Sequence, residues 1–161
     1  METKKTKKYT IYRFLPMIIL MILIFVFSAM PAEESSEQSD FIVELISKSY
    51  SGLCARVLSP EALGVLTLIV RKTAHFSEYA ILSCTVLFAF GKILVEPEVL
   101  YVVSLLISHV YAVSDEIHQY FVPGRCMAYK DVMIDTAGGL TAILIYALIK
   151  RSKNKKNTSN N

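Results

Sequence analysis

Four long stretches of apolar residues divide this chain, and polar or charged residues separate them. The first stretch contains the uncharged run MIILMILIFVF (17–27), and the other three are nearly as apolar. A helix needs about 20 mostly apolar residues to cross the hydrocarbon core of a membrane, so each stretch predicts a transmembrane helix. The four predicted spans cover residues 11–30, 74–94, 99–117 and 132–149. The pattern therefore predicts an all-α, polytopic membrane protein whose membrane domain covers residues 11–149, between basic tails at 1–10 and 150–161.

The segment between the first two spans contains shorter helical patterns. Residues 41–50 place four apolar side chains on one helical stripe, which is typical of an amphipathic helix. Ser59-Pro60-Glu61 provides a capping serine, a proline at the first helical position and an acid in the first turn. The apolar run that follows is too short to cross a membrane, so residues 60–70 are predicted to form a short helix at the interface. Residues 32–40 are polar and are expected to be mobile.

The charges indicate which side of the membrane each end occupies. The 161 residues carry a net charge of +3, but residues 1–13 hold five bases and one acid, and residues 150–161 hold five bases. Residues 14–149 hold seven bases and thirteen acids. Because bases beside spans favour the cytoplasm, both termini are predicted to be cytoplasmic in a bacterial cell membrane. Basic tails also occur in nucleic-acid-binding proteins, but no nucleic-acid motif accompanies these, so no nucleic-acid partner is expected.

Three features leave alternatives open. The basic start, apolar core and small residues at 28–32 also resemble a signal peptide, whose cleavage would leave three spans. Arg71 and Lys72 would lie outside the cell, where bases are less favoured, although ten bases in the tails outweigh them. Cys54 and Cys126 both face outward in this topology, which would allow a disulfide between them.

Polar residues gather at the predicted outer ends of three spans. His75, Glu78 and Tyr79 share one helical face at the start of the second span. An acid within a span costs several kcal/mol unless it faces protein or water, so Glu78 and Asp135 are expected to point inward. The candidate ligand-binding residues are Lys72, His75, Glu78, Tyr79, Asp115, Glu116, Gln119, Arg125, Asp131 and Asp135. Gly138, Gly139 and Ala142 instead form a small-residue face that is typical of close helix packing in membranes.

Four short blocks together resemble the VanZ-like family of bacterial membrane proteins. Residues 71–82 contain a Lys-x-x-His-x-x-x-Tyr block, and residues 111–139 contain Asp-Glu-x-x-Gln, Pro-Gly-Arg and Asp-x-x-x-Asp-x-x-Gly blocks. The matching residues are Lys72, His75, Tyr79, Asp115, Glu116, Gln119, Pro123, Gly124, Arg125, Asp131, Asp135 and Gly138. The resemblance implies a small helical envelope protein in a family whose namesake is linked to low-level resistance to the glycopeptide teicoplanin.

Two functions for the polar cluster follow. As a binding site, it would hold a lipid-linked cell-wall component or an amphiphilic antibiotic beside the membrane lipids, with Lys72 and Arg125 contacting phosphate. As an enzyme acting on a lipid or glycan carrier, it would use Asp115 or Glu116 as the base, His75 as a proton partner and Arg125 as an anion clamp. The candidate catalytic residues are therefore His75, Asp115 and Glu116.

Two further interpretations of the cluster stay open. It would act as a purely structural clamp if its acids and bases only hold three helices together. His75, Glu78, Asp115, Glu116 and His118 are also metal-ligand types, but their spacing matches no known zinc motif, so no metal is expected. No phosphate-binding loop or nucleotide-binding fingerprint is present, and no cofactor is expected.

Overall fold

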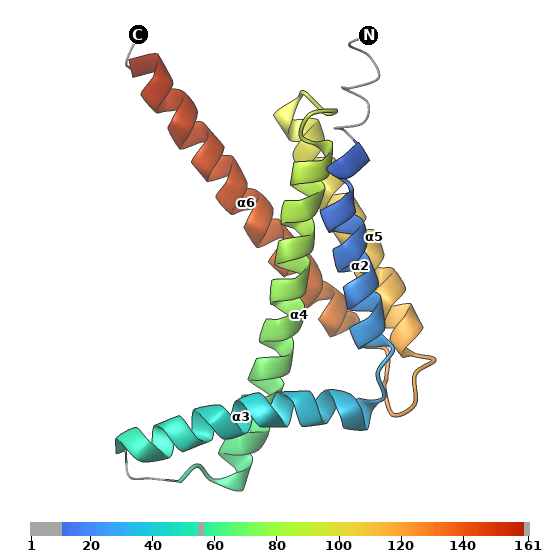
Figure 1. Cartoon of the computed structure of the whole chain (residues 1–161), viewed down its shortest axis with the longest axis vertical. Helices are drawn as coiled ribbons and strands as arrows, with labels where there is room; N and C mark the ends of the chain where they lie inside the picture. Colours follow the sequence, from blue (N-terminus) through green and yellow to red (C-terminus); the bar gives the residue numbers. More distant parts are fainter. Residues whose placement is uncertain (1–10, 55–56, 160–161) are drawn as a thin grey trace.

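The computed structural model describes residues 11–54 and 57–159, and all regular structure within them is helical (Figure 1). The predicted all-α fold is therefore confirmed. The helices are α2 (Leu15–Ser28), α3 (Ala32–Cys54), α4 (Pro60–Phe90), α5 (Pro97–Gln119) and α6 (Tyr129–Ser159).

Three of these helices, α4, α5 and α6, are each long and apolar enough to cross a membrane. The helix α2 has 14 residues, which rise only about 21 Å, short of the roughly 30 Å hydrocarbon core. The helices α2 and α3 meet the same requirements of length and apolar composition only when they are taken together, as one span bent by 105°. The described residues thus contain three candidate spans, or four if the bent pair counts as one, so the predicted four is the upper limit.

The segment before α4 differs from its prediction in two ways. Residues 32–40, expected to be mobile, form the first turns of α3, where the Ser36 hydroxyl donates to the Ala32 carbonyl at 2.7 Å. Residues 60–70, expected to form a separate short helix, are continuous with the next span because no glycine or proline interrupts residues 70–74. The predicted helix start is confirmed, since the Ser59 hydroxyl accepts from the Ala62 amide at 3.3 Å.

The packing of α4 against α6 depends on two adjacent glycines. A Cβ atom at Gly138 would lie 2.1 Å from the Phe76 carbonyl oxygen, and one at Gly139 would lie 2.6 Å from the Ser83 hydroxyl. That hydroxyl also forms a buried 2.8 Å hydrogen bond with Ser108 of α5. The predicted role of these glycines in close helix packing is therefore confirmed.

The helices place two distinct ends on the molecule (Figure 1). The start of α2, the turn between α4 and α5, and the end of α6 lie at one end. At the other end, α3 lies across α4, near the 120–128 loop and the first turns of α6. We call this second end the α3 end.

Candidate functional site

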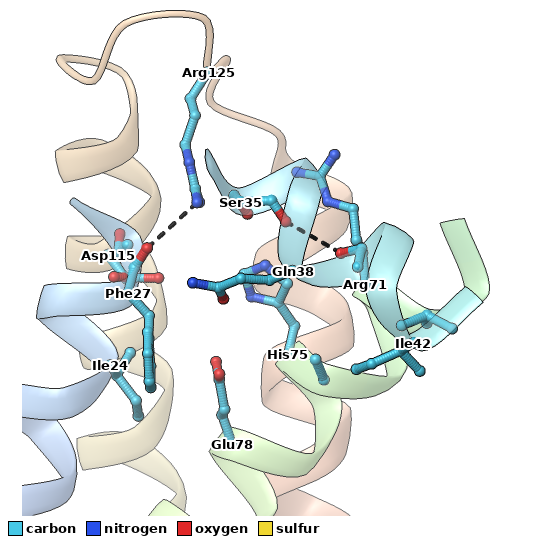
Figure 2. Close-up of a pocket in the computed structure, with 14 residues that line it drawn as sticks. Ile24, Phe27, Ser35, Gln38, Ile42, Arg71, His75, Glu78, Asp115 and Arg125 are labelled. Atoms are coloured by element: carbon cyan, nitrogen blue, oxygen red, sulfur yellow. Dashed lines mark hydrogen bonds between the residues drawn. The ribbon is translucent and has the colours of Figure 1, made fainter. Parts of the chain in front are cut away.

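A partly open cavity of about 220 Å³ lies at the α3 end, lined by residues of α2, α3, α4, α5 and the 120–128 loop (Figure 2). Four predicted binding residues line it: His75, Glu78, Asp115 and Arg125. They come from two helices and a loop that are far apart in sequence. The structure therefore brings this part of the predicted cluster together around one space.

The remaining wall of the cavity includes residues that sequence reasoning missed. The helix α3 contributes Ser35, Gln38, Ser39 and Ile42, and α4 contributes Arg71. The α3 residues recur at helical spacing, which was a usable signal, but the polar composition of residues 32–40 favoured a mobile segment. For Arg71, the usable signal was its charge, because a base is unusual at the predicted outer side of the membrane.

Several predicted binding residues instead hold helices and loops together. Lys72 of α4 forms an ion pair with Asp131 of α6. Glu116 is fully buried, and its carboxylate accepts from the Ala128 backbone amide at 2.9 Å, which fixes the loop before α6. Tyr79 is also fully buried and belongs to the main apolar core. These contacts fit the structural-clamp interpretation for part of the cluster.

The Pro123-Gly124-Arg125 turn fastens the elbow between α2 and α3, and we call it the elbow clamp. Arg125 donates through Nε to the Met30 carbonyl at 2.9 Å. It also donates through Nη2 to the Phe27 carbonyl at 3.3 Å (Figure 2). Carbonyls at a helix end lack intrahelical partners, so this guanidinium caps α2. Pro123 accepts from the Ala32 amide at 3.3 Å, and Gly124 has a φ of 74°.

The elbow clamp requires glycine at its centre. A Cβ atom on Gly124 would lie 3.0 Å from the Ala32 Cβ, and its positive φ is rare for residues with side chains. Burial and the nearby Arg71 guanidinium lower the pKa of Arg125, while Asp115 acts in the opposite direction. Arg125 nevertheless stays charged. It therefore both supports α3 and presents a cation to the cavity.

A buried carboxylate lies behind the cavity wall. Asp135 of α6 is fully buried, and neither of its carboxylate oxygens has a hydrogen-bond partner. One of them lies 3.6 Å from Nδ1 of His75, whose side chain lines the cavity. On the opposite wall, Gln119 donates to the Asp115 carboxylate at 3.1 Å. The cavity thus contains a histidine with an acid behind it and a second acid held in place.

Among residues 11–54 and 57–159, no three His, Cys, Asp or Glu side chains are arranged to hold a metal ion. The His118 ring instead stacks on Phe25 with its centroid 4.4 Å away. Cys126 has a free thiol, so the disulfide considered with Cys54 is not formed; the side chain of Cys54 lies outside the described residues.

The comparison with protein families shows to which family this chain belongs. The VanZ/LLP1 family model matches residues 14–150, which include every helix that lines the cavity. The chain belongs to the VanZ/LLP1 family. A search of curated proteins and a search of solved structures each found no match.

In this VanZ/LLP1 protein, the four family-like blocks have different structural tasks. His75 and Asp115 line the cavity, Lys72 and Asp131 join α4 to α6, and the elbow clamp holds α3. Gly138, the last residue of the final block, lets α6 approach α4. The blocks therefore describe a cavity together with the contacts that keep its walls in place.

Proposed function

We propose that this VanZ/LLP1 protein binds the polar head of a lipid-linked or amphiphilic ligand at the outer face of the bacterial membrane. A cell-wall precursor or a teicoplanin-type glycopeptide has this chemistry, and binding would lower susceptibility to the antibiotic. The supporting observation is one cavity lined by Arg71, Arg125, His75, Glu78 and Asp115 at the α3 end. In this proposal, the α3 end faces outward and both termini are cytoplasmic.

The apolar part of the cavity wall supports an amphiphilic ligand in particular. Phe27 of α2 and Ile42 of α3 line the cavity, and each is also 45% exposed on the outer surface. Neighbouring side chains on α2, such as Ile22, are similarly exposed. A ligand with its polar head among the charged groups can therefore leave its hydrocarbon chain against α2 and α3, in contact with lipid.

The test compares a gene-deletion strain complemented with the wild-type chain or with variants. Asp115→Asn keeps the shape of a cavity-lining side chain and removes its charge, while Lys153→Gln changes an exposed residue of α6 and is the matched control. We expect Asp115→Asn to show the teicoplanin susceptibility of the deletion strain at normal protein abundance. Unchanged susceptibility to teicoplanin and vancomycin after deletion, in a strain that expresses the protein, would contradict the resistance role.

Catalysis on a lipid or glycan carrier is a second candidate, favoured by His75 and Asp135. A histidine that faces a cavity with a carboxylate 3.6 Å behind it resembles a general base oriented by an acid. Purified full-length protein would be incubated with bacterial lipid extract, and products would be followed by mass spectrometry. The catalytic role predicts a product that His75→Gln protein does not form; no product from wild-type protein would exclude it.

A further inference from the structure

Two charged side chains in the cavity wall have no partner among the described residues. Arg71 and Glu78, both on α4, make no hydrogen bond or ion pair there. Three other charged groups near the cavity are engaged: Lys72 pairs with Asp131, Arg125 caps α2, and Asp115 accepts from Gln119. Arg71 and Glu78 are therefore free to contact a ligand.

The two free charges lie at different depths of the same cavity. They are seven residues apart on α4, which is two turns and about 10 Å along one helical face. Figure 2 shows Arg71 and Arg125 near the loop end of the cavity, Glu78 at the opposite end, and Gln38 and His75 between them. The cavity thus has guanidinium groups near the α3 end and carboxyl groups deeper along α4.

We propose that the cavity selects zwitterionic head groups that carry both a phosphate and a primary amine. The phosphate would contact Arg71 and the charged edge of Arg125, and the ammonium would donate to Glu78 beside Asp115. This inference rests on the proposed binding function and names its ligand class. A charge without a partner is costly beside hydrocarbon, so a ligand that supplies both counter-charges binds better than an anion alone.

The experiment measures binding of short-chain lipids to full-length protein in detergent. The probes are dihexanoyl phosphatidylethanolamine, its N-acetylated form, which lacks the charged amine, and dihexanoyl phosphatidylglycerol, which supplies only the anion. Affinities are measured by native mass spectrometry for wild type, Glu78→Gln and Arg71→Gln. Glu37→Gln on α3, outside the cavity lining, is the matched control for loss of an acid. Thermal unfolding without lipid checks that each variant is folded.

Wild-type protein should bind phosphatidylethanolamine about tenfold more tightly than either anionic probe, as expected for one charge-assisted hydrogen bond. Glu78→Gln should lose this preference and keep its affinity for phosphatidylglycerol, whereas Arg71→Gln should bind all three probes more weakly. Equal affinity of wild-type protein for all three would overturn amine recognition and leave the binding function standing. Binding that no cavity variant weakens would overturn both.

Discussion

At the scale of single residues, glycine allows close helix packing at positions where a side chain would collide with a neighbouring helix. Gly138 allows the backbone of α6 to approach the Phe76 carbonyl of α4. Gly64, earlier in α4, has no neighbour within 4 Å of the position where a Cβ atom would lie. The two glycines therefore differ in their environment, although both belong to helices that are long and apolar enough to cross a membrane.

Gly138→Ala is expected to destabilise the protein, because its methyl group would force α4 and α6 apart. We expect a loss of about 1–3 kcal/mol in the free energy of unfolding, as for overpacking in a protein interior. Gly64→Ala is the control and should leave stability unchanged or raise it, since alanine favours helix more than glycine does. Both are measured by denaturant unfolding in detergent. Equal stability of the two variants would contradict the close contact.

At the scale of helices, the position of α3 depends on contacts that come from other segments. The amide of its first residue, Ala32, donates to Pro123 of the elbow clamp, and its inner face supplies Ser35, Gln38 and Ser39 to the cavity. The side chains of Phe41 and Leu45 are 70% and 59% exposed, so little of its apolar stripe packs against the chain itself. The elbow clamp is therefore expected to hold this helix against the bundle.

Arg125→Ala should release α3 and open the cavity. In a chain whose cysteines are replaced by serine, Ser39→Cys places a thiol on the cavity face of α3, where Ser39 is 8% exposed. Arg125→Ala removes the charged hydrogen bonds to α2, and the introduced thiol should then react with a maleimide about tenfold faster. Arg151→Ala, on the exposed end of α6, is the control. The same reaction rate in both variants would show that Arg125 does not restrain α3.

The sequence predicted which segments are helical better than it predicted how the helices continue and contact one another. Apolar length was enough to identify the helical fold, and Ser59 marked the true start of α4. The continuity of residues 60–90 was missed because the apolar run before residue 71 is too short to cross a membrane by itself, although nothing after it breaks the helix. The role of Arg125 was not predictable, because its partners are backbone carbonyls of α2 that only the folded elbow brings near. Residue types in the sequence identified the candidates. Only the tertiary contacts separate those that line the cavity from those that hold helices and loops together.

At the scale of the whole molecule, the distribution of charge and the position of the cavity together concern the orientation of the protein in the membrane. The start of α2 and the end of α6, the two helix ends next to the basic tails in the sequence, both lie at the end opposite α3 (Figure 1). Arg71 opposes this orientation by charge alone. Its position in the cavity wall gives it another task, so it is a weaker topology signal than the tails.

Labelling of intact cells tests this orientation. Cys126 is exposed with a free thiol in the loop at the α3 end, and Ser152 is exposed near the end of α6. In chains that lack the other cysteines, a membrane-impermeant maleimide should label Cys126 in intact cells. In a Cys126→Ser chain, it should label Ser152→Cys only after permeabilisation. The reverse pattern would place the cavity on the cytoplasmic side, where it would not meet an extracellular antibiotic. The orientation by basic tails and the proposed resistance function would then fail together, while lipid binding by the cavity would remain open to the short-chain lipid experiment.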